Sequence, residues 1–439
     1  MDQSKKTTSN EPSRRDFIKT TAAVSLATLT AGAGQAFAAG SDKIRVGLIG
    51  CGDRGVGAAW DCIQGSPNME IYALGDVFQD KIDYALNTYQ HGEKGESYMG
   101  GRLKPEEFNV TPERCFVGFD AYKQVIATDV HLIVQATPPH FRPMHLRAAI
   151  EAGKHVFIEK PAAVDPPGIR SVMASGDLAK EKGLSIVAGT HRRNQTSYME
   201  TIKRIHDGAI GEIIAAQAYW NSSGMNWHLN PRQTGWSDVE WQIRSWPYFS
   251  WLSGDFIVEQ HVHNLDVMRW ALDAPPVKCI SLGGREVRKG EQYGNVFDHF
   301  ATEFEFPGGV RVASMCRQIE GTSRRVSERV VGTKGTSNCN GRIDGQNAWR
   351  YEQESPDPFI HEHTNMVTAI RAGNPMNDGR RVAESTMMSI MARTSAYSGR
   401  EISWNWIMNA SKLDFTPAKY ELGKKSVDPV AVPGQTELV

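Results

Sequence analysis

The chain has 439 residues, of which 40% are apolar and 23% are charged, and its 49 basic and 50 acidic residues nearly cancel. This composition excludes a disordered chain, and the length allows two or three domains. The near-zero net charge removes the electrostatic basis for a nucleic-acid binder. No apolar run outside residues 20–39 approaches the roughly 20 residues of a membrane span. The six cysteines form no CxxC pair, so no structural zinc site is predicted.

The N-terminal segment has the pattern of an export signal. Arg14 and Arg15 lie in a polar stretch, a weakly apolar run covers residues 20–33, and small residues at Ala36 and Ala38 suit signal peptidase. These elements in order predict a twin-arginine signal peptide over residues 1–38, with an ordinary basic tail as the alternative. We therefore expect a periplasmic or otherwise exported protein. Because that pathway carries folded proteins, a cofactor would be loaded before export.

A nucleotide-binding pattern begins at the apolar run of residues 44–49. A loop of the form GxGxxG follows at residues 50–55, then an amphipathic segment and a second apolar run at residues 71–75. Asp76 ends that run, 21 residues after the last glycine. Strand, loop, helix, strand and acid in this order are typical of a Rossmann dinucleotide-binding unit, whereas the glycines alone would indicate only a turn.

Each glycine of this loop has its own physical role. Gly50 allows a tight turn, Gly52 lets the backbone approach a pyrophosphate, and Gly55 lets the helix pack closely on the sheet. The free N–H groups at the helix N-terminus face the phosphates. Asp76 accepts hydrogen bonds from ribose hydroxyls and repels a 2′-phosphate, which favours NAD over NADP, although Lys81 keeps NADP open. The predicted cofactor-binding residues of this unit are Gly50, Gly52, Asp53, Arg54, Gly55 and Asp76.

Apolar runs and helical segments alternate as far as about residue 188. This alternation predicts an α/β domain over residues 42–191, built on a doubly wound parallel sheet. Two of the later runs end in polar motifs, one at residues 137–140 and the other, Glu-Lys-Pro, at residues 159–161. Ligands bind at the carboxyl ends of parallel strands. The cofactor-binding residues predicted at these two strand ends are Thr137, His140, Glu159 and Lys160.

The second half of the chain, residues 192–410, changes character. Alternating apolar and polar residues at 297–306 and 310–318 predict a hairpin within an open, mostly antiparallel sheet. The segment from Glu259 to Leu272 predicts one helix. The expected architecture is thus a second, α+β domain for substrate and oligomer contacts, followed by a C-terminal tail at residues 411–439.

Four residues are candidates for catalysis. Lys160 lies at a strand end beside the predicted nicotinamide position, while Glu259, His263 and Asp266 have the spacing of one helix face. An imidazole oriented by carboxylates is a general base near neutral pH, which alcohol oxidation requires. A single histidine is more often structural, and His261 with His263 and Glu259 would also suit a metal. We predict no metal, because a nicotinamide already accepts the hydride.

Three motifs together resemble the Gfo/Idh/MocA oxidoreductase family: the glycine loop at 50–55, Glu-Lys-Pro at 159–161 and His-Asn-Leu-Asp at 263–266. The resemblance covers most of the chain after the N-terminal segment. It implies a Rossmann domain and an open-sheet domain that also mediates oligomers. It further implies that a lysine and a histidine contact the reacting hydroxyl, and these correspond to Lys160 and His263.

Candidate substrate contacts come from the resemblance and from composition. The family usually has an aspartate four residues before the histidine, where this chain has Glu259, and Arg193 resembles family residues near the cofactor or substrate. Seven of the 11 tryptophans lie between residues 220 and 270, where aromatic faces either stack on sugar rings or pack in a core. We take Arg193, Trp220 and Trp227 as candidate substrate contacts.

The expected function is NAD-dependent oxidation or reduction of a secondary hydroxyl on a sugar, a cyclitol or a derivative. His263 would act as general base, oriented by Glu259 or Asp266, and Lys160 would stabilise the reacting oxygen. Export predicts a tightly bound cofactor, and the open sheet predicts a homodimer or homotetramer. Two alternatives remain: a redox-neutral enzyme that uses NAD to cleave or epimerise glycosides, and a non-catalytic carbohydrate-binding accessory protein.

Overall fold

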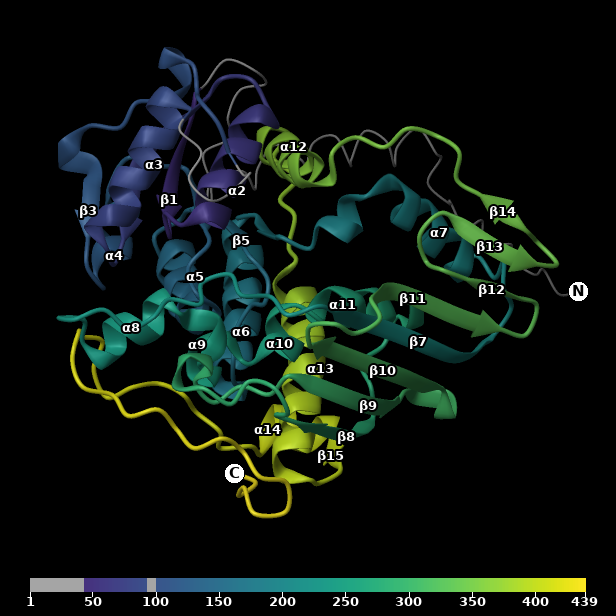
Figure 1. Cartoon of the computed structure of the whole chain (residues 1–439). Helices are drawn as coiled ribbons and strands as arrows, with labels where there is room; N and C mark the ends of the chain where they lie inside the picture. Colours follow the sequence, from purple (N-terminus) through teal and green to yellow (C-terminus); the bar gives the residue numbers. More distant parts are fainter. Residues whose placement is uncertain (1–42, 93–99) are drawn as a thin grey trace, which may run out of the picture.

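The computed structural model describes residues 43–92 and 100–439, so the predicted signal peptide at residues 1–38 lies outside the described residues. The chain forms two sheets, one in each half (Figure 1). The first has six parallel strands in the order β3-β2-β1-β4-β5-β6, which confirms the predicted doubly wound α/β fold. Its strands are β1 (Ile44–Ile49), β2 (Met69–Asp76), β3 (Cys115–Val117), β4 (Leu132–Gln135), β5 (His155–Ile158) and β6 (Ile186–Ala188).

Helices cover both faces of this sheet, which explains why its strands are apolar rather than alternating. In β1, every residue except Arg45 is buried, and Val46 lies between Ile71 of β2 and Leu132 of β4. The order of the strands reverses at β1, so the loops after β1 and β4 diverge and leave a crevice at their carboxyl ends. The helices are α2 (Asp53–Gln64), α3 (Gln79–His91), α4 (Ala121–Ala127), α5 (Arg142–Glu151) and α6 (Pro166–Lys182).

The second sheet has nine strands in the order β14-β13-β12-β11-β7-β10-β9-β8-β15. All neighbours are antiparallel except β7 and β10, and the predicted hairpin is present as β9 and β10. The mostly antiparallel sheet of the predicted α+β half is therefore confirmed. The strands are β7 (Ile213–Ser222), β8 (Lys278–Gly284), β9 (His299–Glu305), β10 (Arg311–Gln318), β11 (Arg325–Gly332), β12 (Gly335–Ser337), β13 (Arg342–Gly345), β14 (Trp349–Arg350) and β15 (Ile402–Ser403).

One long helix, α13 (Gly379–Ser398), joins the two halves. It lies between α6 of the first half and α11 and β8 of the second, and nearly all of its side chains after Val382 are buried (Figure 1). Another late helix, α12 (Pro358–Arg371), packs on α2. The remaining helices are α7 (Thr196–His206), α8 (Asp238–Arg244), α9 (Ser250–Ser253), α10 (Phe256–Glu259), α11 (Val262–Leu272) and α14 (Trp404–Asn409).

The single helix predicted from Glu259 to Leu272 is wrong. The structure ends α10 at Glu259 and begins α11 at Val262. Two backbone bonds show why: the His261 N–H donates to the carbonyl of Phe256, five residues back, and the His263 N–H donates to that of Gln260, three residues back. The regular four-residue repeat of an α-helix is therefore interrupted between Glu259 and His263.

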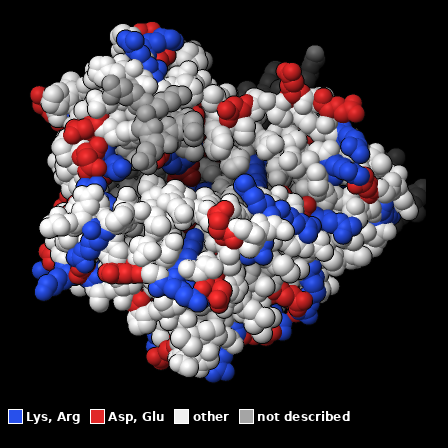
Figure 2. Space-filling view, viewed as in Figure 1, with Lys and Arg blue, Asp and Glu red and all other residues white. Residues whose placement is uncertain are grey.

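The surface carries both signs of charge. Lys and Arg side chains are interspersed with Asp and Glu over the face drawn in Figure 2, in keeping with the near-zero net charge. Within the described residues, no helix combines the length and the apolar character that crossing a bilayer requires.

Candidate active site

A cavity of about 950 Å³ opens between the two halves, at the carboxyl ends of the parallel strands. One wall comes from the loops after β1, β2, β4, β5 and β6, and the facing wall from a segment of the second half, residues 223–246, and from the region around α10 and α11. Twelve predicted site residues line it: Gly50, Gly52, Asp53, Arg54, Gly55, Asp76, Thr137, Glu159, Lys160, Trp227, Glu259 and His263.

The glycine loop has the geometry that a pyrophosphate needs. Gly50 has φ +94°, a conformation that favours glycine. A Cβ at Gly55 would lie 1.8 Å from the carbonyl oxygen of Gly50, so α2 packs against the loop only because this side chain is absent. At Gly52, which caps α2, a Cβ would meet no atom within 4 Å. The open space at the N-terminus of α2 therefore fits the phosphates of a dinucleotide.

Asp76 closes the same end of the cavity. Its Oδ2 accepts from the backbone N–H of Cys51 at 2.7 Å, and its Oδ1 accepts from Phe78 at 3.0 Å. Burial raises the pKa of this carboxyl, and the two backbone hydrogen bonds oppose that rise. The acid is thus held between the ends of β1 and β2, where the predicted contact to ribose hydroxyls would be made.

Arg54 and Glu159 bind each other across the floor of the cavity. The Arg54 Nε donates to Glu159 Oε1 at 2.6 Å, and its Nη1 donates to Asp61 Oδ2 at 3.1 Å. Glu159 Oε2 in turn accepts from the backbone N–H of Lys160 at 3.0 Å. Burial would lower the pKa of Arg54, but the surrounding carboxylates outweigh it and raise the pKa. The pair therefore fixes the backbone that carries Lys160.

Lys160 meets Glu259 at the junction of the two halves. Its Nζ lies 2.6 Å from the carbonyl oxygen of Glu259 and 3.1 Å from the carboxylate Oε1. The two side chains are only 11% and 9% exposed, so water screens this ion pair weakly. The structure thus brings together residues 99 positions apart in the chain.

His263 lines the same cavity as Lys160. The ring of Trp220 stacks on its imidazole, with centroids 5.8 Å apart, and His191 lies edge-on at 4.9 Å. Its Nδ1 is buried and has no hydrogen-bond partner among the described residues. Burial, followed by the charges of Lys160 and its neighbours, lowers the pKa of His263 well below its ordinary value. The imidazole is therefore neutral near pH 7 and can accept a proton.

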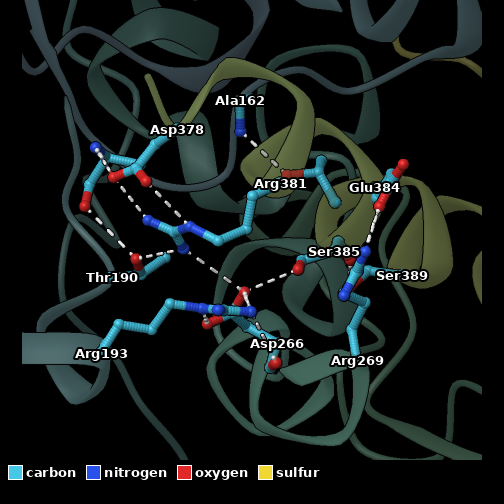
Figure 3. Close-up of polar contacts among 12 residues, drawn as sticks. Ala162, Thr190, Arg193, Asp266, Arg269, Asp378, Arg381, Glu384, Ser385 and Ser389 are labelled. Carbon is cyan, nitrogen blue, oxygen red and sulfur yellow. Dashed lines mark hydrogen bonds and ion pairs between the residues drawn. The ribbon is translucent and has the colours of Figure 1, made fainter. Parts of the chain in front are cut away.

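The predicted orientation of His263 by a carboxylate is not found. Glu259 directs its carboxylate to Lys160, and Asp266, which does not line the cavity, points to Arg193 and Ser385 (Figure 3). Arg193 donates to Asp266 Oδ2 at 2.7 Å, and the Ser385 hydroxyl donates to Oδ1 at 2.6 Å. Asp266 lies about one turn after His263 in α11, on the side of the helix that packs against α13. Its side chain therefore does not lie beside the imidazole, although the sequence spacing suggested that it would.

Three other predicted contacts lie outside the cavity wall. His140 is buried and its Nε2 lies 3.0 Å from the hydroxyl of Tyr420, in the C-terminal tail. Arg193 donates its hydrogen bonds to Asp266. Trp220 does not line the cavity but stacks on His263, which does. His261 points away from the cavity and lies 2.7 Å from the Ser314 hydroxyl of β10. In the described part of the chain, no group of three or more His, Cys, Asp or Glu residues could hold a metal ion.

Sequence reasoning missed two features of the wall. His191 lies three residues after the end of β6 and lines the cavity beside His263; burial lowers its pKa to about 3. The segment 223–246 contributes Trp236, Arg244 and Trp246 as well as the predicted Trp227. The tryptophan-rich composition of that region was the available signal, but composition does not show which rings turn inward.

The fold and the cavity define a two-domain dinucleotide-binding protein with a lysine and a histidine in one cleft. A family model described as an oxidoreductase family with an NAD-binding Rossmann fold matches residues 44–190. A second model, the GFO/IDH/MocA C-terminal domain, matches residues 198–338. The chain therefore belongs to the Gfo/Idh/MocA family of NAD-binding oxidoreductases.

Curated relatives are distant. An uncharacterized oxidoreductase of Streptococcus pneumoniae is 26% identical over 57% of this chain and 66% of its own length. A 2,7-anhydro-N-acetylneuraminate hydratase of Escherichia coli is 26% identical over 41% of this chain and 44% of its own length. The scyllo-inositol 2-dehydrogenase (NAD(+)) of Bacillus subtilis is 24% identical over 67% and 73%. The chain thus spans less than two thirds of the length of the first two.

Solved structures share the fold. An oxidoreductase domain protein from Kribbella flavida superimposes with a TM-score of 0.66 at 16% identity, covering 83% of this chain and 99% of its own. A scyllo-inositol dehydrogenase from Lactobacillus casei, with bound NAD(H) and scyllo-inositol, gives 0.60 at 15% identity over 82% and 99%. At these identities the likeness establishes the architecture alone.

A matched pair of glycine substitutions tests the cofactor site. Gly55→Ala pushes a methyl group into the Gly50 carbonyl, so we expect it to lower the free energy of unfolding by about 3 kcal/mol or more. Gly52→Ala meets no protein atom, so the melting temperature should stay near that of the wild type. It should nevertheless weaken NAD binding by about tenfold, measured by titration calorimetry. Unchanged NAD affinity in Gly52→Ala would show that the phosphates lie elsewhere.

Proposed function

We propose that this protein transfers a hydride between a secondary hydroxyl of a sugar or cyclitol and NAD. The observation that carries the proposal is the convergence of Lys160 and His263 on one cavity, whose other end fits a dinucleotide. Two ionisable groups of opposite function, a buried ammonium and a neutral imidazole, suit the removal of a proton from an alcohol. When bound, NAD supplies the acceptor for the hydride that leaves the carbinol carbon.

The side chains divide the work on the reacting hydroxyl. His263, which lines the cavity and is neutral near pH 7, takes the hydroxyl proton. The ammonium of Lys160 has three N–H donors, and Glu259 accepts from it through the carbonyl and through the carboxylate. One donor therefore remains for the substrate oxygen, where it stabilises developing negative charge in a site screened from water.

The substrate class is supported by a relative and by the wall of the cavity. One relative, matched over 67% of this chain, is by name a scyllo-inositol 2-dehydrogenase, and scyllo-inositol is a cyclitol. The wall of segment 223–246 offers the rings of Trp227 and Trp246, which lie edge to face at 5.5 Å. Indole faces suit the C–H faces of a sugar or cyclitol ring, while polar side chains of the cavity can form hydrogen bonds with its hydroxyl groups.

A second candidate is a redox-neutral reaction, in which NAD is reduced and reoxidised within one turnover. It is favoured by the hydratase among the relatives, whose name describes a reaction without net oxidation. The same residues would serve, because His263 would take the hydroxyl proton while the carbinol carbon gave its hydride to the bound nicotinamide, and it would return a proton when that hydride came back. Product formation without accumulation of NADH distinguishes this reaction from a dehydrogenase.

Export by the twin-arginine pathway with NAD already bound completes the proposal. An ion pair joins two walls of the cavity: Arg244 of α8 donates to both oxygens of Asp80 of α3, at 2.9 and 3.0 Å. The Arg244 guanidinium also lies 3.8 Å from the centre of the Phe78 ring. Segment 223–246 is therefore fastened over the nucleotide end, which favours a cofactor that stays bound.

We also propose a homodimer or homotetramer assembled through the second sheet. Its outer face exposes apolar side chains on adjacent strands: Leu282 of β8, which is 74% exposed, and Met315 of β10 flank Ala301 of β9. An exposed apolar face of this kind is typical of a protein interface.

The first test identifies the bound nucleotide. Denaturing the freshly purified protein should release about one NAD or NADH per chain, measured by chromatography and mass spectrometry. A panel of sugars and cyclitols is then screened for a change in absorbance of the reduced cofactor. A preparation that neither contains nor binds a nicotinamide nucleotide would refute the proposal.

The second test removes the ammonium. Lys160→Met should lower kcat by roughly 10²–10⁴-fold, since the reacting oxygen loses its donor, while NAD binding stays near the wild-type level. Lys154→Met is the matched control. Lys154 lies just before the N-terminal end of β5, at the other end of the strand from Lys160, and donates to the carbonyls of Thr128 and Val130. Retained turnover in Lys160→Met would exclude the assigned role.

The third test opens the ion pair over the cofactor. Asp80→Asn should speed dissociation of NADH by ~fivefold, the order of magnitude of a partly exposed pair. Stopped-flow fluorescence with excess competing NAD measures that rate. Arg232→Gln removes an ion pair within segment 223–246 itself, to Asp238, and serves as the control. Equal dissociation rates in all three proteins would show that the Asp80–Arg244 pair does not retain the cofactor.

A further inference from the structure

Three chain segments that carry cavity residues are each fastened to the first two turns of α13. The loop after β5, which carries Lys160, is held where the Ala162 N–H donates to Thr386 Oγ1 at 3.1 Å. The segment after β6, which carries His191, is held where the Thr190 hydroxyl accepts from Arg381 at 2.8 Å. These segments reach the cavity from different strands, yet they share one support.

The third tie holds α11, the helix of His263, through Asp266 (Figure 3). Asp266 accepts from the Ser385 hydroxyl on α13 at 2.6 Å and from Arg193 at 2.7 and 3.1 Å. Arg193 belongs to the same turn as His191, three residues after Thr190. The carboxylate therefore joins α11 both to α13 and to the segment after β6.

The charges of this cluster are balanced. Arg381 donates to Asp378 at 3.0 Å and lies 3.7 Å from Asp266, so two arginines and two aspartates face one another. Burial would raise the pKa of Asp266, but Arg193 and Arg381 outweigh it and hold the pKa below its ordinary value. Asp266 thus stays ionised near neutral pH, and the directional bonds of the cluster keep the segments in register.

We propose that Thr190, Asp266, Arg381 and Ser385 are positioning residues that set the distance between the imidazoles of His191 and His263 inside the cavity. The expected effect on turnover rests on the proposed function, whereas the expected effect on the distance between the two imidazoles does not. None of the four lines the cavity, so each acts through a neighbour: Thr190 through His191, and Asp266 through His263. A shift of about 1 Å in such a site costs up to ~100-fold in rate.

The deciding experiment compares two substitutions at Thr190. Thr190→Val keeps the volume and removes the hydroxyl that accepts from Arg381, whereas Thr190→Ser keeps the hydroxyl and removes a methyl group. If position is set by the hydrogen bond, Thr190→Val should lower kcat by roughly 10- to 100-fold with KM and NAD affinity within twofold, and Thr190→Ser should restore kcat. If only packing matters, Thr190→Ser will be the more impaired variant, and the proposal is overturned.

A readout independent of turnover uses the ring nitrogens of His191 and His263, followed by nitrogen-15 NMR in the protein as purified. Both sets of signals should shift in Thr190→Val and in Ser385→Ala. They should stay unchanged in the control Ser389→Ala, whose hydroxyl bonds only to a carbonyl of its own helix. Unshifted signals in both test variants overturn the proposal. A wild-type protein that oxidises no sugar or cyclitol refutes the proposed function instead, and the NMR comparison still decides the positioning.

Discussion

The ion pair between Lys160 and Glu259 is the contact on which the candidate site depends. It joins the end of a parallel strand in one half to the end of a short helix in the other, with both side chains nearly excluded from water. Breaking such a pair on one side leaves a buried charge without compensation, which is strongly unfavourable. The two halves are therefore held at a fixed separation beside the cavity, and one N–H of the ammonium is left without a bond to Glu259.

Around this pair, two arginines form ion pairs with buried carboxylates. Arg54 engages Glu159 and Asp61, and Arg193 engages Asp266. The imidazole of His263 lies in the same cavity, and its Nδ1 has no hydrogen-bond partner among the described residues. A frame of ion pairs around this base lowers the reorganisation that proton transfer requires. It also explains why a long buried helix, α13, passes behind the site: it carries the bonds that hold the frame.

The segment 223–246 contributes both aromatic rings and a charged side chain to the wall of the cavity. It supplies aromatic rings near Lys160 and Glu259, and it supplies Arg244 at the nucleotide end. The C-terminal tail fastens it from outside, since the N–H of Val239 donates to the carbonyl of Gly423 and the Gln242 amide donates to that of Lys425. This one segment would thus serve both to retain the bound cofactor and to bind the ring of the substrate.

Local sequence patterns were sufficient to predict the features that depend on neighbours along the chain. The glycine loop, the acid after β2 and the Glu-Lys-Pro motif could be placed because a strand, its following loop and a helix N-terminus are fixed by local geometry. The tertiary structure decided which way side chains point. His140 turned to Tyr420 and Asp266 to Arg193, while His191 entered the cavity, because each direction depends on partners 70 or more residues away or on the packing of another helix. A break of two residues between α10 and α11 was enough to redirect Glu259 to Lys160, and the spacing of residues on a regular helix contains no information about such a break.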